Sequence, residues 1–473
     1  MSARTAGLLA LATVLAAALR VGVLLSDSLG VLDSDEAVVG LMARHILDGD
    51  PTAFFWGQSY GGTLEPMLVA LAFALAGSGV LALKLVPALL FALAGLLVWL
   101  IGRRTIGDRG AVIAVTLFGL GPAYVVWWST KERGFYGVTL VLSLLVVLLV
   151  LRLHDRVDRR DVAALGLAFG VGWWTNAMIG FVAVPALCWL VWRRPTVLRQ
   201  AWIAVVCAAL GASLWIREAM VNDFAPLRQG PEPGNDTYLD HLHTFFAADL
   251  PMALGLRIPF SLEWPAGEVV ARVVELVAVF AVVWAVARKR GRPWEVLVVV
   301  ALAYPFLFAF APVAAYNLEP RYLFVLSPIV ALLAGLALAR NALLATAVCS
   351  AALLLSVLGL RSLADGDLLA AATGGVAVPA DATPALDALE ESGVRYALAS
   401  YWLAYRLTFE SDENVIVAST GQSRYPPYQR AVLGSSKPAR VHVAGRDERA
   451  ARRDLESKGY RRVERGGWIL YLP

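Results

Sequence analysis

A short acidic run near the start of the chain contains residues suited to acid–base chemistry. Asp33, Asp35 and Glu36 lie within four residues and follow the first apolar stretch. A partly desolvated carboxylate can take a proton from an acceptor hydroxyl or amine, and carboxylates also bind hard cations. The structural alternative is a helix over residues 37–47 capped by Ser34 or Asp35, because acids favour its positive end. The catalytic and the capping interpretations are compatible, because a capped helix would also hold Asp35 rigidly.

Cations stand at two later places where apolar stretches end. Lys131, Glu132 and Arg133 are consecutive, and Arg321 follows Glu319 in a short loop. Charges at such places are costly unless they are solvated or paired. The cations could hold a phosphate, for which the guanidinium fork is well shaped. The structural alternatives are a snorkelling cluster at the first place and a salt bridge to Glu319 at the second.

Other polar or aromatic residues give weaker signals. Two histidines two residues apart share a face only on a strand, so a loop pair is more often solvated than metal-bound. Tryptophan pairs fit an interfacial belt or a surface on which a sugar stacks. The residues concerned are Asp240, His241 and His243 as metal ligands, Trp127, Trp128, Trp173 and Trp174 as aromatic pairs, Asn176 and Glu218 near helix ends, and residues 424–428 as a proline-rich loop that could contact an acceptor glycan.

The composition indicates a membrane protein. Of the 473 residues, 59% are hydrophobic and 16% charged, against about 25% charged in soluble domains. The net charge of +4 is too small to suggest a nucleic-acid partner. The three cysteines lie in apolar runs without zinc spacing, which argues against disulfides and thiol catalysis.

Apolar stretches long enough to cross a bilayer recur along the chain. An uncleaved first span is favoured over a signal peptide, because no small-x-small site follows and Arg20 interrupts the apolar core. A shorter stretch, 66–77, suits an interfacial helix. The predicted spans, about 11 in all, are 6–25, 80–101, 111–128, 137–151, 162–175, 177–192, 200–216, 269–287, 294–312, 321–339 and 341–360.

Charge placement predicts the sidedness of these spans. With the N-terminus in the cytoplasm, the short inner loops hold 15 Lys or Arg residues and the outer loops before residue 361 hold seven. This agrees with the positive-inside rule. The chain is therefore expected in the cell (plasma or inner) membrane, with loops 26–79 and 217–268 and the C-terminal region outside.

The end of the chain has a different composition. Residues 381–473 include 14 Lys or Arg and 12 Asp or Glu, and their pattern alternates short helices and strands. The sequence predicts a transmembrane domain over 1–360, a linker over 361–380, and a small extracytoplasmic α/β domain with a four-stranded sheet over 381–473.

Short motifs follow one another in a fixed order over most of the first 340 residues. They comprise Asp35-Glu36, Ala43 to Pro51, Gly57 to Pro66, Lys84 to Leu90, Gly102 to Arg109, Pro122, Ser129 to Tyr136, and Glu319 to Tyr322. Their order and sidedness resemble GT-C glycosyltransferases, such as the family 39-like protein O-mannosyltransferases and aminoarabinose transferases. Glu65 and Glu132 depart from the family pattern, so the donor sugar does not follow from the resemblance.

The resemblance implies an all-α GT-C bundle that moves a sugar from a polyprenyl-phosphate-linked donor to an extracytoplasmic acceptor. It implies that Asp35, as general base, and Glu36 are catalytic, and it leaves a divalent cation (Mg or Mn) open. The cations Arg321, Arg133 and Lys131 would then bind the donor phosphate, and Asp33, Tyr60, Glu65, Glu132, Tyr136, Glu319 and Tyr322 would line the substrate cavity.

Two other functions remain open. A transporter or flippase of lipid-linked substrates would have pseudo-symmetric halves and mid-membrane polar residues, and neither is evident. A catalytically inactive GT-C scaffold that acts as a binding protein would use the external α/β domain as its binding module.

The predicted topology can be tested by cysteine labelling with a membrane-impermeant reagent in intact cells. Single cysteines introduced as Ser28→Cys and Ser411→Cys should react, and Thr105→Cys should react only after lysis, because the charge asymmetry places Thr105 inside. Protection of Ser411→Cys in intact cells would contradict the scheme.

Overall fold

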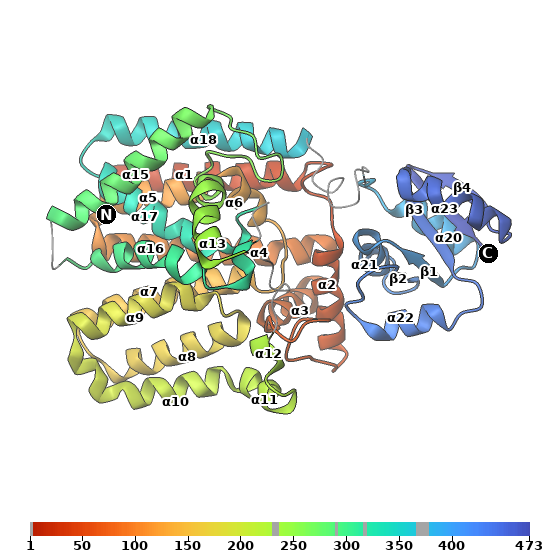
Figure 1. Cartoon of the computed structure of the whole chain (residues 1–473), viewed down its shortest axis with the longest axis horizontal. Coiled ribbons are helices and arrows are strands. Elements are labelled where there is room, and N and C mark those ends of the chain that lie inside the picture. The colour runs from red at the N-terminus through yellow and green to blue at the C-terminus, as the bar shows by residue number, and fades with distance from the viewer. Residues whose placement is uncertain (1–2, 229–235, 289–291, 316–318, 366–377) are drawn as a thin grey trace.

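The computed structural model describes residues 3–228, 236–288, 292–315, 319–365 and 378–473. Figure 1 shows a large helical body and a smaller C-terminal body beside α2 and α3. Most of the predicted linker 361–380 lies outside the described residues, and residues 361–365 end α18.

The first part of the chain is helical. Its helices are α1 (Ala3–Leu24), α2 (Ser34–Leu47), α3 (Leu64–Ala76), α4 (Val80–Thr105), α5 (Gly107–Leu120), α6 (Ala123–Trp128), α7 (Tyr136–Asp155), α8 (Arg159–Thr175), α9 (Ile179–Arg193), α10 (Ala201–Gly211), α11 (Ser213–Val221), α12 (Ala225–Arg228), α13 (Tyr238–Thr244), α14 (Leu250–Ala253), α15 (Glu268–Arg288), α16 (Glu295–Phe308), α17 (Ser327–Leu338) and α18 (Ala342–Asp365). Short helical turns are η1 (Pro195–Gln200), η2 (Phe245–Asp249), η3 (Pro312–Ala315) and η4 (Arg321–Leu326).

Fewer helices than expected are long and apolar enough to cross a membrane. In the described part of the chain there are five, or six if the pair bent by 110° after Arg193 counts as one span. The expected number of about 11 is therefore not confirmed. Several apolar stretches are broken into shorter helices, as at Gly121 and Pro122 between α5 and α6 and at Ala212 between α10 and α11.

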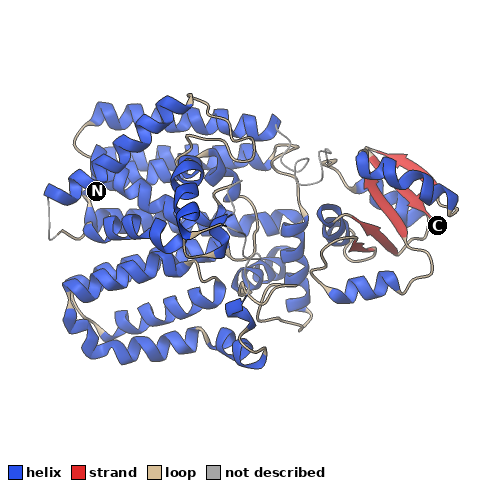
Figure 2. Cartoon of the chain, in the orientation of Figure 1, coloured by secondary structure: helices blue, strands red, loops and turns tan. Residues whose placement is uncertain are grey.

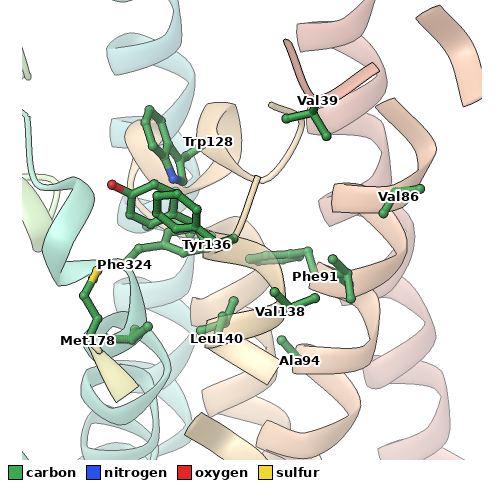
Figure 3. Close-up of a cluster of buried hydrophobic side chains, with 14 of the residues drawn as sticks. Val39, Val86, Phe91, Ala94, Trp128, Tyr136, Val138, Leu140, Met178 and Phe324 are labelled. Atoms are coloured by element: carbon green, nitrogen blue, oxygen red, sulfur yellow. The ribbon is translucent and has the colours of Figure 1, made fainter. Parts of the chain in front are cut away.

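The centre of the bundle is an apolar cluster between α4, α5 and α7. Phe91 stacks on Phe118 with ring centroids 4.4 Å apart. Figure 3 shows Phe91, Ala94 and Val138 close together in this cluster. Lipid tails are as apolar as these side chains, so close packing of this kind holds membrane helices together.

Small residues allow α8 and α10 to approach closely along their length. Gly166 and Gly170 are four residues apart on one face of α8, and a Cβ on either would collide with a carbonyl oxygen of α10, that of Ala204 or Ala208 respectively. This is the small-xxx-small packing of membrane helices. The pair matters for the site because the last turn of α8 carries Trp173 and Trp174, which line the cavity described below.

The C-terminal body is an α/β domain whose strands form one sheet (Figure 2). Its elements are α20 (Thr383–Glu391), β1 (Tyr396–Ala399), α21 (Tyr401–Glu410), β2 (Ile416–Ser419), α22 (Pro426–Leu433), β3 (Ala439–Val443), α23 (Arg446–Ser457), β4 (Arg461–Arg465) and β5 (Trp468–Leu472). The strand order is β2-β1-β3-β5-β4, with β2, β1 and β3 parallel and β5 antiparallel to both neighbours.

The predicted four-stranded sheet was wrong by one strand. The segment 461–472 forms a hairpin rather than a single strand, because Gly466 and Gly467 turn the chain with φ of 55° and 83°. Two residues with positive φ make the two-residue turn that joins antiparallel strands, and glycine adopts it without strain.

The close packing of α8 on α10 predicts a difference between two glycines. Gly170→Ala should destabilise the protein by about 1–3 kcal/mol, the usual cost of overpacking. Gly95→Ala should be neutral or slightly stabilising, because no atom lies within 4 Å of the added Cβ and alanine favours the helix. Thermal unfolding in detergent measures both, and equal melting temperatures would contradict this packing.

Candidate active site

The acidic run begins α2. Asp33 is the N-cap: its carboxylate accepts the Glu36 backbone N–H at 3.1 Å, and the Glu36 carboxylate accepts the Asp33 backbone N–H at 3.4 Å. The predicted helix is present, but its cap is Asp33 rather than Ser34 or Asp35. This reciprocal capping box leaves Asp35 in the first helical turn, with its side chain released from capping.

Six charged side chains meet at this end of α2: Asp33, Asp35, Glu36, Lys84, Lys131 and Arg133. We call this group the ion cluster. The Lys84 ammonium lies 2.8 Å from Glu36, and the Lys131 ammonium lies 2.9 Å from Glu36 and 3.5 Å from Asp33. The Arg133 guanidinium donates two 2.8 Å bonds to Asp33 and one of 3.2 Å to Asp35.

The ion cluster is almost closed to solvent. Side-chain exposure is 0% for Glu36 and 2% for Asp33 and Lys131, against 29% for Asp35. Burial alone would raise the pKa of Asp33, but the charges of Arg133 and Lys131 outweigh burial and hold that pKa well below its usual range. Since a buried charge left unpaired costs about 3–5 kcal/mol, the cluster fixes α2, α4 and the 131–133 loop relative to one another.

Glu65 and Glu132 form a second acidic pair behind the ion cluster. Both are buried, at 1% and 0% exposure. Glu65 accepts the Val138 backbone N–H at 2.9 Å, and Glu132 accepts the Gly134 backbone N–H at 3.1 Å. Burial raises the pKa of both, and the neighbouring Glu65 raises the pKa of Glu132 further. The pair therefore favours a protonated Glu132.

A cavity of about 1200 Å³ opens beside Asp35. Its lining combines charged groups, tyrosines and a wall of aromatic rings. Of the predicted site residues it includes Asp33, Asp35, Tyr60, Lys131, Arg133, Tyr136, Glu319, Arg321 and Tyr322. Glu36, Glu65 and Glu132 are buried outside this lining.

The three predicted phosphate-binding cations differ in access. Side-chain exposure rises from 2% for Lys131 through 10% for Arg133 to 30% for Arg321. Arg321 forms an ion pair with Glu319, and its guanidinium lies over the Trp128 ring, 5.7 Å from the centroid. The salt bridge considered from the sequence is thus present, on a side chain that still lines the cavity.

The C-terminal domain completes the cavity. The Tyr401 hydroxyl donates a 2.5 Å hydrogen bond to Asp35, and Trp402 and Arg424 belong to the cavity lining. Tyr401 and Trp402 were missed in the sequence, because Tyr401 is 366 residues from its partner and no motif links the two. Arg424 was noted only as part of a loop.

The tryptophan pairs and the polar residues near helix ends lie partly in the cavity and partly at the surface. Trp127, Trp128, Trp173, Trp174 and Asn176 all line the cavity. Glu218 lies at the surface, where it bonds Asn222.

The expected loop histidines lie on a helix. His241, on α13, contacts the Ala309 carbonyl through Nδ1. Within the described residues, no three His, Cys, Asp or Glu side chains converge as metal ligands do. The Asp33 oxygens instead accept from Arg133, and the Asp35 oxygens accept from Arg133 and Tyr401, so the acidic run in this arrangement does not fit a divalent cation.

Further contacts hold the C-terminal domain against α2 and the first loop (Figure 1). The Arg44 guanidinium lies 2.7 Å from Asp412, and the Trp56 and Tyr425 rings stack with centroids 4.0 Å apart. His45 Nε2 lies 3.4 Å from Glu413, and this hydrogen bond is the main cause that raises the His45 pKa. The domain is thus docked by polar and aromatic contacts around His45.

Docking should depend on pH through His45, whose charged neighbours are Glu413, Asp50 and Asp48. A raised pKa means that the pair stabilises fully below the ordinary histidine value, about 6.5, and that this stabilisation is lost as pH rises through the raised value. His45→Gln should therefore cost up to about 1 kcal/mol more at pH 6 than at pH 9, where only the pH-independent ring contacts of His45 with Trp56 and Tyr425 are lost. Thermal unfolding at both pH values measures this, and an equal loss at both would contradict it.

This architecture is similar to that of known membrane enzymes. Residues 63–216 match the family model described as dolichyl-phosphate-mannose-protein mannosyltransferase. No curated protein matches the chain in sequence.

Solved structures match the whole chain more fully. ArnT from Cupriavidus metallidurans, bound to undecaprenyl phosphate, is 14% identical, with a TM-score of 0.65 and 98% of each chain covered. The Archaeoglobus fulgidus oligosaccharyltransferase, in complex with Zn and sulfate, is 13% identical, with a TM-score of 0.56, covering 92% of this chain and 68% of that one. The resemblance read from the motifs is confirmed: the chain has the fold of the GT-C membrane glycosyltransferases.

Proposed function

We propose that this protein is an integral membrane glycosyltransferase that moves a sugar from a polyprenyl-phosphate-linked donor to an extracytoplasmic acceptor. The observation that supports it most is the cavity in which Asp35 lies beside cations and aromatic rings. A carboxylate can accept the acceptor's proton, cations can stabilise a phosphate leaving group, and aromatic rings can stack on a sugar or isoprenoid.

Asp35 is proposed as the general base. It is the most exposed acid of the ion cluster, and Tyr401 and Arg133 fix the direction of its carboxylate. Such fixed placement keeps the base within reach of a bound hydroxyl or amine. Glu36, expected beside it as catalytic, contacts Lys84 and Lys131 and is fully buried. We therefore assign Glu36 a positioning role, through Lys131.

The atoms of the proposed reaction balance with the donor, the acceptor and Asp35. The acceptor oxygen or nitrogen forms a bond to the anomeric carbon as its proton passes to Asp35. The bond from that carbon to the phosphate oxygen breaks, and its electron pair leaves with the lipid phosphate. Developing negative charge on the phosphate calls for nearby cations.

Arg321 is the most accessible of the three proposed phosphate ligands, and Arg133 and Lys131 would act from the cavity wall. That a structure with the same fold is bound to undecaprenyl phosphate supports a donor of this class.

The proposed site lies on the outer side of the membrane. The cation asymmetry of the predicted loops favours an N-terminus in the cytoplasm and a C-terminal domain outside. The acidic first loop and the C-terminal domain would then meet the acceptor together. A lipid-linked donor suits a site on this side, because transfer from it does not require a soluble nucleotide sugar.

The assignment of the base predicts the effect of an isosteric change. Asp35→Asn should lower transfer by roughly 100-fold or more, the usual scale for losing a general base, and should leave donor binding nearly unchanged. Radiolabelled sugar transfer by the purified protein measures the first effect, and lipid binding measures the second.

Asp27→Asn is the matched control, because Asp27 is an exposed acid of the same loop and lies outside the cavity lining. Its transfer rate should equal that of the wild type. Near-normal turnover by Asp35→Asn would remove Asp35 from the catalytic role.

A further inference from the structure

Four cations line the cavity, and one of them differs in its partners. Lys131, Arg133 and Arg321 each form an ion pair with a carboxylate. Arg424, from the loop before α22, forms no ion pair within the described part of the chain. It is therefore the cavity cation whose charge is least compensated by the protein.

Arg424 is nevertheless held in place. Its backbone N–H donates to the Tyr405 hydroxyl at 2.6 Å, and its Nε donates to the Tyr401 hydroxyl at 3.1 Å. The guanidinium carbon lies 5.9 Å from the centroid of the Phe55 ring. A Cβ on Gly57 would come within 2.9 Å of the Arg424 Cα, so the first loop packs directly on this backbone.

Only the inner nitrogen of the Arg424 guanidinium is used by these contacts. Within the described residues, the terminal nitrogens Nη1 and Nη2 have no hydrogen-bond partner, although the side chain lines the cavity. A guanidinium fixed through Nε, with both outer nitrogens unused, is arranged to bind two oxygens of a planar or tetrahedral anion.

The charge balance of the lining agrees with an anionic ligand. Four cations face three carboxylates, those of Asp33, Asp35 and Glu319, which leaves 4 − 3 = +1. A lipid-linked sugar phosphodiester carries one negative charge and would neutralise the cavity. During transfer Asp35 gains a proton, so the lining reaches +2 as the departing phosphate becomes a dianion.

We propose that Arg424 binds the donor phosphate, so that the C-terminal domain forms part of the donor site. This proposal rests on the proposed glycosyltransferase function and adds a phosphate ligand from a domain outside the helical bundle. Tyr401 then joins the two halves of the site, because its hydroxyl accepts from Arg424 and donates to Asp35. Phosphate binding and the orientation of the base would be coupled through this one side chain.

Equilibrium binding of undecaprenyl phosphate to the full chain in nanodiscs tests the proposal. Arg424→Gln should weaken binding by roughly 10- to 100-fold, the loss expected for hydrogen bonds to a charged group. Arg424→Lys, which keeps the charge and the apolar stem, should also bind several-fold more weakly, since one ammonium cannot replace a two-pronged contact. Arg430→Gln is the control, because Arg430 is exposed on α22 and lies outside the lining.

Two further arms identify the group that Arg424 recognises. Undecaprenol has the same tail without the phosphate, and its affinity should be equal in wild type, Arg424→Gln and Arg430→Gln. Inorganic phosphate should compete with undecaprenyl phosphate in the wild type and much less in Arg424→Gln. A loss of undecaprenol binding in both Arg424 variants would show that Arg424 only maintains the cavity, and would overturn the proposal.

The outcomes separate this proposal from the function on which it rests. Equal affinities of wild type and Arg424→Gln for undecaprenyl phosphate would overturn the role of Arg424 and leave the transferase proposal standing. A wild type that does not bind undecaprenyl phosphate at all would overturn both. The assay measures binding and not sugar transfer, so a wrong choice of acceptor cannot produce either result.

Discussion

The need to pair buried charges governs this structure. Glu36 has no contact with solvent, so it must keep Lys84 of α4 and Lys131 of the 131–133 loop within hydrogen-bond distance. Asp33 in the same way holds Arg133. These pairs fix the start of α2 to the bundle, and Asp35 is the cluster acid that remains accessible. A rigid frame of buried ions thus presents one carboxylate to the cavity.

The C-terminal domain forms part of the candidate site, because three of its residues line the cavity or contact Asp35. None of its described strands contributes a residue to the cavity lining, but α21 brings Tyr401 and Trp402 to the cavity, and the loop between β2 and α22 brings Arg424. Stacking of Trp56 on Tyr425 and the pairs around His45 keep the domain docked. We infer that movement of this domain would alter both the proposed base and the proposed phosphate site, because the Tyr401 hydroxyl contacts Asp35 and Arg424.

Local patterns in the sequence predicted much of this arrangement. The acidic run, the 131–133 charges and the 319–322 motif were each recognised, because their residues are close neighbours in the sequence. Most of these side chains line one cavity. The number of spans was not confirmed, because hydropathy does not reveal where Gly121 and Pro122 break a helix. Burial of Glu36, and the contact of Tyr401 with Asp35, depend on tertiary packing that no local spacing encodes.

The most direct test of the central claim is in vitro transfer by the purified full chain from a panel of polyprenyl-phosphate sugars, with release of the lipid phosphate as the readout. We predict that at least one donor releases polyprenyl phosphate in stoichiometric amounts with glycosylated acceptor, and that the release depends on Asp35. Binding of the lipid without release from any donor, in the presence of cell-envelope glycan, lipid and protein acceptors, would contradict the transferase account and favour a binding or transport function.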